Sequence, residues 1–260
     1  MEPERRTLNT IKYHTHLLVS IPPIPGVGDL VLQHGELLRQ ELSDGNLQWL
    51  CYLSSTSVYG HCGGELVDED YPARPSSELA KMSIVAEKGW LNLAHDLGLS
   101  AQVFRLGGIY GPGRSAVDTI VKQKPLSEGQ KMRASRQFTS RVHVEDIGQS
   151  LKAAIFMPSS GKIYNIVDDD PAPREEVFRY ALELIERKWP GYIDHEAACS
   201  MAKPCEQKGI LRRDKRVSNA RVKKELGLRL LHPSYKSGLQ SIIDQMDTPV
   251  CYNREFKPNR

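Results

Sequence analysis

Residues 52–60 read Tyr52-Leu53-Ser54-Ser55-Thr56-Ser57-Val58-Tyr59-Gly60, and this stretch decides the fold class. The apolar run from Leu47 to Leu53 ends abruptly in four consecutive hydroxyl residues. That pattern is typical of a buried parallel strand whose carboxyl end opens onto a polar site, and in doubly wound sheets ligands bind at that end. An ordinary Ser/Thr turn after a strand is the alternative interpretation.

Strand-like and helix-like segments alternate along the chain. Strands are predicted at 16–21, 47–53, 101–106 and 162–167, and helices at 29–42, 79–97, 144–155, 175–188, 218–226 and 235–246. This alternation indicates βα units and a parallel sheet. We therefore predict an α/β fold, with a partial doubly wound (Rossmann) sheet in residues 1–167. Residues 168–260 are predicted to form a smaller C-terminal α+β lobe that is interleaved with the first part.

The composition is that of a globular protein, with 260 residues of which 40% are hydrophobic. The five cysteines form no C-x-x-C pair and no His/Cys cluster at zinc spacing, so we expect neither disulfides nor a metal site. No apolar run approaches the ~20 residues of a membrane span. The acidic start, Met1-Glu2-Pro3-Glu4, does not resemble a signal peptide. We therefore expect a reducing intracellular compartment, such as the cytoplasm or a plastid.

A basic segment lies between Lys208 and Arg229, with nine Lys/Arg residues against two acids. Three interpretations stay open at this point. Such a run is usually a solvated helix face, but arginine also suits the oxygens of a phosphate-bearing ligand. Nucleic acid binding is the weakest of the three, because the segment lacks interleaved aromatic residues.

Four blocks carry a family resemblance: residues 52–60, F-R-L-G-G-I-Y-G-P-G-R (104–114), R-V-H-V-E-D-I-G-Q-S-L (141–151) and I-Y-N-I-V-D-D-D (163–170). In this order and spacing they resemble the extended short-chain dehydrogenases/reductases. These are NAD(P)-dependent epimerases, dehydratases and reductases of nucleotide sugars and related substrates. The resemblance implies NAD or NADP as cofactor and a small-molecule substrate. We expect no nucleic acid and no membrane as partner, and a homodimer is left open.

The same resemblance assigns roles to individual residues. Ser55 takes the position of the catalytic Ser/Thr that orients the reacting oxygen. The residues expected beneath the nicotinamide half of the cofactor are Ser20, Ile21, Pro22, Ser54, Gly107 and Gly108. The residues expected to contact the substrate are Tyr59, Arg114, Arg141 and Arg213. His143 is interpreted as a structural histidine at a helix start, and Gly111–Ala116 as a turn, because Pro112 lacks the N–H that a phosphate loop would use.

Two features of the family pattern are missing. The family's Y-x-x-x-K-x-x-x-E would fall on Leu79, Ser83 and Glu87, and only Glu87 agrees. Glu78, Lys81 and Tyr71 are the nearest substitutes for the proton donor, and the alternative interpretation of each is an ordinary solvent-exposed residue. Three functions therefore stay open: an NAD(P)-dependent oxidoreductase or epimerase with an altered acid/base group, a non-catalytic NAD(P)-sensing or scaffolding protein, and a protein whose basic segment binds an acidic partner.

The second missing feature is the glycine-rich dinucleotide loop, of which nothing precedes His16. In the Rossmann strand order 3-2-1-4-5-6, the segment 16–21 corresponds to strand four. We therefore expect this chain to be a truncated form of a longer protein, lacking strands one to three. Such a chain should expose the segment 16–21 at an open sheet edge and bind NAD(P)H weakly.

Overall fold

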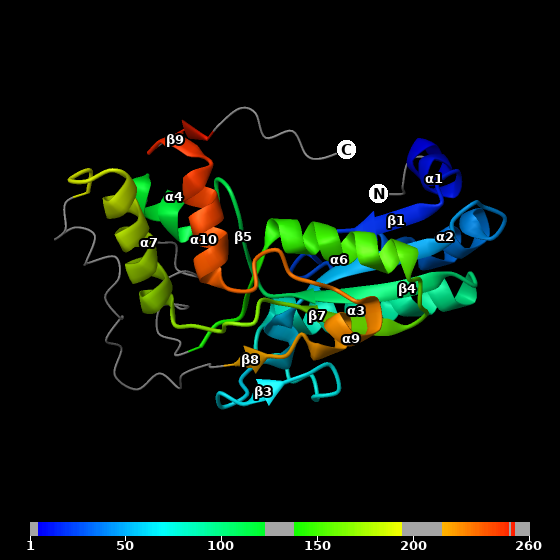
Figure 1. Ribbon diagram of the computed structural model, residues 1–260. Coiled ribbons are helices and arrows are strands. Elements are labelled where there is room, and N and C mark those ends of the chain that lie inside the picture. Colours follow the sequence, from blue (N-terminus) through cyan, green and yellow to red (C-terminus); the bar gives the residue numbers. More distant parts are fainter. Residues whose placement is uncertain (1–4, 123–137, 194–214, 250, 253–260) are drawn as a thin grey trace.

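A four-stranded parallel sheet organises the chain (Figure 1). The structure is a computed structural model that describes residues 5–122, 138–193, 215–249 and 251–252. Its first half contains α1 (Arg5–Lys12), β1 (His16–Val19), η1 (Leu32–His34), α2 (Gly35–Leu42), β2 (Trp49–Ser55), η2 (Thr56–Tyr59), β3 (Leu66–Val67), α3 (Glu78–Asp96) and β4 (Ser100–Leu106). The second half contains β5 (Gly108–Tyr110), α4 (Ala116–Val121), β6 (Arg141–His143), α6 (Val144–Phe156), β7 (Lys162–Ile166), α7 (Arg174–Lys188), β8 (Arg216–Val217), α9 (Ala220–Leu226), α10 (Tyr235–Asp244), β9 (Met246–Thr248) and β10 (Cys251–Tyr252).

The main sheet has the strand order β1-β2-β4-β7, and all of its pairs are parallel. Leu18 pairs with Cys51, and Cys51 pairs with Gln102 of β4. The α/β class and the parallel sheet predicted from the sequence are therefore confirmed. β1 is an edge strand of this sheet, and Leu18 on it is 45% exposed.

Helices cover both faces of the sheet. Successive strand residues point to opposite sides, and in β2 both sets of side chains are apolar and need to be buried. Leu50 and Tyr52 of β2 pack in one cluster with residues of α2 and α3, including Trp90. Their neighbours Trp49 and Cys51 belong to a second cluster, with residues of α6 and α9. This two-sided burial explains why β2 is a continuous apolar run in the sequence.

A smaller lobe consists of α4, α7 and α10, which lie together at one end of the molecule (Figure 1). Its core includes Ile120, Phe178 and Leu239, one from each helix. By contrast, α9 packs against β7 and α6 on the sheet. The lobe therefore includes α4, which precedes residue 168 in the sequence. Conversely, α9 follows residue 168 but packs on the sheet.

The element boundaries follow local capping. Ser77 caps α3 by accepting a hydrogen bond from the N–H of Ala80, and Gly227 ends α9 in the left-handed conformation at φ 61°. The segment predicted as one helix at 29–42 is instead divided into η1 and α2, and the Asp29 carboxylate caps its first turn by accepting from the N–H groups of Val31 and Leu32. None of the helices in the described ranges is long and apolar enough to cross a membrane.

Gly60 follows η2 and joins it to the polar loop. Its φ is +70°, and a Cβ there would lie 2.0 Å from the carbonyl oxygen of Arg74. Only glycine fits this turn. The loop that follows pairs its short strand β3 in parallel with β8, which brings the segment around residue 215 back beside η2.

Candidate functional site

A cavity of about 1100 Å³ lies at the carboxyl ends of β1, β2 and β4. The sheet supplies one wall, including Ser20, Ser54 and Gly107. The lobe supplies the other, including Phe178 and Tyr235. The position agrees with the rule that ligands bind outside the carboxyl ends of strands in open α/β sheets.

The structure brings most of the residues named from the sequence to this cavity. Those that line it are Ser20, Pro22, Ser54, Ser55, Gly107, Gly108, Arg114 and Arg141. Ile21 is 57% exposed and is not among the lining residues. Tyr59 is fully buried, and its hydroxyl donates to Asn165 Oδ1 at 2.8 Å, so the structure gives it a core position instead of a place in the cavity. Arg213 lies outside the described residues.

Ser55 is positioned by the turn that follows β2. It is the N-cap of η2, and its Oγ accepts a hydrogen bond from the N–H of Ser57 at 3.1 Å. A hydroxyl that accepts in this way still has its own proton to donate. Ser55 can therefore donate a hydrogen bond to an oxygen in the cavity.

Ser54, in the sheet wall of the cavity, is held by a buried ion pair. Its Oγ donates to Glu87 Oε1 at 2.5 Å, and Arg105 Nη2 contacts Glu87 Oε2 at 2.7 Å. Both charged side chains are nearly buried, with 6% and 4% exposed for Arg105 and Glu87. The Arg105 guanidinium also lies over the Tyr59 ring, 5.0 Å from its centroid. Glu87, which matches the family pattern, is thus a structural anchor for the end of β2.

The positions of the missing Tyr and Lys are occupied by groups that cannot transfer a proton to a ligand. Leu79 lines the cavity with an aliphatic side chain. Ser83 is buried, and its hydroxyl donates to the backbone oxygen of Leu79 at 2.9 Å. None of the substitutes considered from the sequence, Glu78, Lys81 and Tyr71, is among the described residues that line the cavity.

The charge of the cavity is positive. Its described lining contains Arg114, Lys122, Arg141, Arg174 and Lys215, with Asp118 as the acidic residue. Asp118 is already paired, because Lys122 Nζ lies 3.3 Å from its Oδ1. An excess of cations in a concave site attracts anionic ligands.

Arg141 is fixed at the border between the two walls. Its Nη1 donates to Thr139 O at 2.9 Å and its Nη2 to Ala172 O at 2.7 Å. Burial raises the pKa of the nearby Asp168 to about 8, and neither of its carboxyl oxygens has a hydrogen-bond partner among the described residues. The raised pKa favours the neutral form of the Asp168 carboxyl, so this residue offsets the charge of Arg141 less than an ordinary carboxylate would.

Lys215 is one of the lining residues that the sequence did not single out. It is 8% exposed, and its Nζ donates to the backbone oxygen of Thr56. In the sequence it is one of nine cations in a basic segment, for which a solvated face is the usual outcome. The only signal that could have separated it from its neighbours is its place directly before the short apolar strand β8.

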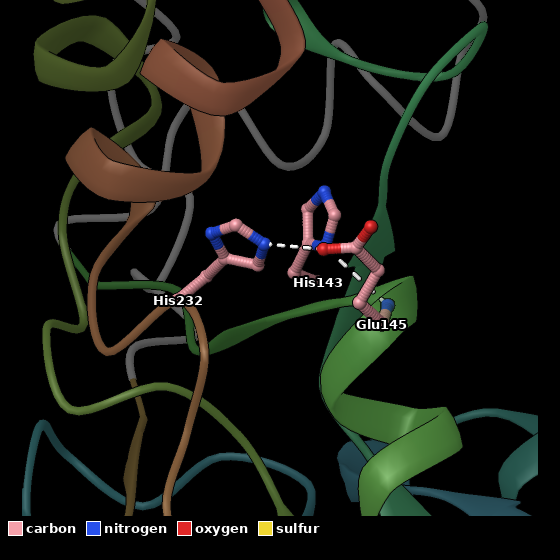
Figure 2. Close-up of side chains that lie close together, drawn as sticks. All are labelled: His143, Glu145 and His232. Carbon is pink, nitrogen blue, oxygen red and sulfur yellow. Dashed lines mark hydrogen bonds and ion pairs between the residues drawn. The ribbon is translucent and has the colours of Figure 1, made fainter. Parts of the chain in front are cut away.

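A second cluster of titratable groups joins α6 to the segment before α10 (Figure 2). His143 caps α6, with its Nδ1 accepting from the N–H of Glu145 at 3.3 Å, which confirms its structural role. His232 Nε2 lies 2.6 Å from Glu145 Oε2. These three residues could offer ligand atoms within 4.8 Å of one another. However, the other ring nitrogens, His143 Nε2 and His232 Nδ1, are buried with no hydrogen-bond partner among the described residues.

Metal-bound histidines almost always donate their second ring N–H to an acceptor, and this cluster offers none among the described residues. We therefore interpret it as a helix cap. It also ties His232 to the start of α6, since Asp146 accepts from the N–H groups of Leu231 and His232 at 2.6 and 3.2 Å.

Acid should weaken the fold through His143. Burial, with a smaller contribution from His232, lowers the pKa of His143 from 6.5 to about 4, so the native state keeps it neutral while the unfolded state binds a proton below about 6.5. Its contribution to stability is therefore complete above pH 6.5 and is lost as the pH falls toward 4. The variant His143→Asn, which retains a capping side chain, should show a flatter decline of unfolding free energy in urea titrations over that window. His95→Asn, whose side chain is 90% exposed in the wild type, should follow the wild-type profile; equal profiles for all three proteins would contradict the assignment.

Comparison with known proteins agrees with this geometry. Residues 36–167 match the sequence model of the NAD dependent epimerase/dehydratase family. Protein YeeZ of Escherichia coli K12 is 33% identical over 132 residues, which are 49% of this chain and 44% of YeeZ. The chain therefore aligns with less than half of that relative's length.

Two solved structures extend the similarity. A conserved protein of unknown function from Silicibacter pomeroyi has a TM-score of 0.69 and 33% identity, covering 95% of this chain and 81% of its own. The structure of MoeE5 in complex with UDP-glucuronic acid and NAD has a TM-score of 0.64 and 21% identity, covering 93% of this chain and 82% of its own. At that identity MoeE5 supports the fold alone. The family match over residues 36–167 confirms the resemblance seen in the sequence, and the chain belongs to the NAD dependent epimerase/dehydratase family.

Proposed function

We propose that this protein is an NAD(P)-dependent oxidoreductase or epimerase that acts on an anionic carbonyl or hydroxyl substrate, such as a nucleotide sugar. The observation that carries the proposal is the cavity itself, which combines Ser55 with an excess of arginine and lysine side chains. MoeE5, a protein of the same fold, has been solved in complex with UDP-glucuronic acid and NAD, and we therefore choose these compounds as the first ligands to test.

The described residues suit one half of the cofactor. Ser20, Pro22, Ser54 and Gly107 line the cavity where the nicotinamide half would lie. A Cβ on Gly107 would be 3.0 Å from Val167 Cγ1 and 3.1 Å from Ser140 O, so glycine keeps this wall tightly packed. Residues 5–15, which precede β1, contain no glycine, and so this part of the chain has no glycine-rich loop to hold a pyrophosphate. The bound cofactor would supply the hydride acceptor or donor of the reaction.

The chain's own residues would orient and hold the substrate. The Ser55 hydroxyl would donate a hydrogen bond to the reacting oxygen, and this bond strengthens as negative charge develops there. Arg114 and Arg174 border the same cavity and are suited to phosphate or carboxylate oxygens.

The second candidate function is a non-catalytic protein that senses NAD(P) or serves as a scaffold. Leu79 in the cavity wall and the internal hydrogen bond of Ser83 favour it, because both remove a proton-transfer group that the family's chemistry uses. Binding of cofactor and sugar nucleotide without turnover would support this second candidate.

Arg114→Gln tests whether the cavity recognises the negative charge of the substrate. Arg114 is exposed and lines the cavity, so its replacement should leave the fold intact. We expect calorimetric titration with UDP-glucuronic acid, in the presence of NADH or NADPH, to give a Kd about tenfold higher than that of the wild type, because about 1.4 kcal/mol of charge-assisted binding is lost. Arg229→Gln removes the same charge from an exposed position outside the cavity and should leave Kd unchanged. Equal Kd values for both variants, or no binding by the wild type, would count against the proposal.

A further inference from the structure

The cavity wall that carries Ser55 also carries the buried Lys215. Its Nζ donates a hydrogen bond to the backbone oxygen of Thr56, the residue directly after Ser55. Both Lys215 and Ser55 line the cavity. The ammonium group and the Ser55 hydroxyl therefore border the same end of β2.

The fold fixes the backbone next to Lys215 on two sides. The N–H of Arg216 donates to Glu65 O at 3.3 Å, and its Nε donates to Gly64 O at 2.9 Å. The N–H of Val217 donates to Ser140 Oγ at 3.1 Å, and Ser140 is itself a lining residue. The position of the ammonium group is thus set by strand pairing and hydrogen bonds, unlike that of a solvated surface lysine.

Several other titratable groups in the described lining already have partners, as the Lys215 ammonium has in Thr56 O, so chemistry and position distinguish Lys215 from them. The Tyr235 hydroxyl donates to Glu176 Oε1 at 2.7 Å, and burial raises the pKa of both Tyr235 and Tyr110. Asp118 accepts from Ser115 Oγ at 2.7 Å and pairs with Lys122. Arginine does not release a proton in proteins. Lysine can do so in enzyme sites, and Lys215 contacts the backbone oxygen of the residue that follows Ser55.

We propose that Lys215 is a catalytic residue of this site, which gives a proton to the substrate oxygen when a carbonyl is reduced and takes one when an alcohol is oxidised. The proposal rests on the proposed function. During reduction, the carbonyl carbon gains a hydride from reduced nicotinamide dinucleotide, and the π electrons of the C=O bond move to oxygen. The oxygen then takes a proton from the Lys215 ammonium, whose N–H bond breaks, and the neutral amine recovers a proton from water. Ser55 keeps its own proton and donates a hydrogen bond throughout.

The reach of Lys215 can be tested without turnover. Pyridoxal 5′-phosphate is an aldehyde with an anionic phosphate, so it should enter the cationic cavity and form an imine with an amine in contact with it. Borohydride reduction fixes the product for peptide mass spectrometry. We expect modification of Lys215 in the wild type, lowered at least tenfold by UDP-glucuronic acid, while the exposed Lys88 reacts equally with and without that ligand. Modification of Lys88 but not of Lys215 would show that Nζ does not reach the cavity and would overturn the proposal.

Kinetics test the proton transfer itself, on the substrate that the wild type turns over. Lys215→Met and Lys215→Arg should each lower kcat by about 10²–10⁴, the range for loss of a general acid or base. Arginine should not restore activity, because it keeps the charge but does not release the proton; recovery in Lys215→Arg would overturn proton donation. Lys88→Met removes an exposed charge on α3 and should leave kcat unchanged.

The two proposals fail in different ways. Turnover that is unaffected by either Lys215 variant would overturn the role of Lys215 and leave the proposed function standing. Modification of Lys215 in a protein that turns over no sugar nucleotide or related carbonyl would instead reject the proposed function, and the proton transfer with it.

Discussion

Replacing Glu87 with alanine is expected to lower the free energy of unfolding by about 3–5 kcal/mol, the cost of removing one partner from a buried ion pair. The substitution leaves the Arg105 guanidinium, 6% exposed, without its carboxylate. It also removes the acceptor of the Ser54 hydroxyl. Urea denaturation of the wild type and the variant at neutral pH measures the difference.

Glu78→Ala is the matched control for that experiment. Glu78 lies on the same helix, with 69% of its side chain exposed, and its nearest ion-pair contact is Lys81 at 3.8 Å. Exposed pairs of this kind contribute about 0–1 kcal/mol. If Glu87→Ala and Glu78→Ala cost the same free energy, the Glu87–Arg105 pair does not anchor the end of β2.

Ser55→Ala is expected to reduce kcat by about 10²–10³, the typical effect of removing one hydrogen-bond donor to a developing negative charge. The variant also loses the N-cap of η2, so its melting temperature should fall slightly. Steady-state rates with NADH or NADPH and the substrate found for the wild type give the comparison. An unchanged kcat would remove Ser55 from the mechanism.

Ser57→Ala serves as the control for Ser55→Ala. Ser57 belongs to the same turn and is exposed, but its contact with Ser55 is made by the backbone N–H, which alanine retains. Ser57 also lines the cavity, so a similar loss of kcat in both variants would show that the effect is not specific to the Ser55 hydroxyl.

The sheet could be predicted from the sequence because it is buried on both faces. Such strands are apolar runs with little alternation, and β2 and β4 show this plainly. The carboxyl ends of these strands carry Ser54, Ser55 and Gly107, so the sequence also predicted where the cavity would lie. The strands of two or three residues, such as β3 and β8, could not be predicted, because they are shorter than any periodicity can reveal.

The side chains that the sequence misplaced depend on contacts between distant segments. Tyr59 ends in the core because Arg105 and Asn165, from β4 and β7, accommodate its ring and its hydroxyl. Lys215 reaches the cavity because β8 pairs with β3 and returns the chain beside Thr56. A run of basic residues does not reveal such strand pairing. Lysine is rarely buried, so the sequence alone favours a solvated position for each lysine of the run.

We expect the cavity at the carboxyl ends of β1, β2 and β4 to bind the nicotinamide half of the cofactor together with an anionic substrate. Hydrogen–deuterium exchange of the 260-residue chain, with and without millimolar NADH plus UDP-glucuronic acid, tests it most directly. We predict slower exchange in peptides that cover residues 54–57, 106–110 and 139–141, which line the cavity, and no change around Gln149, Phe156 and Arg229, which line a separate surface hollow. Unchanged exchange at the cavity peptides, or slower exchange confined to the hollow, would contradict the account.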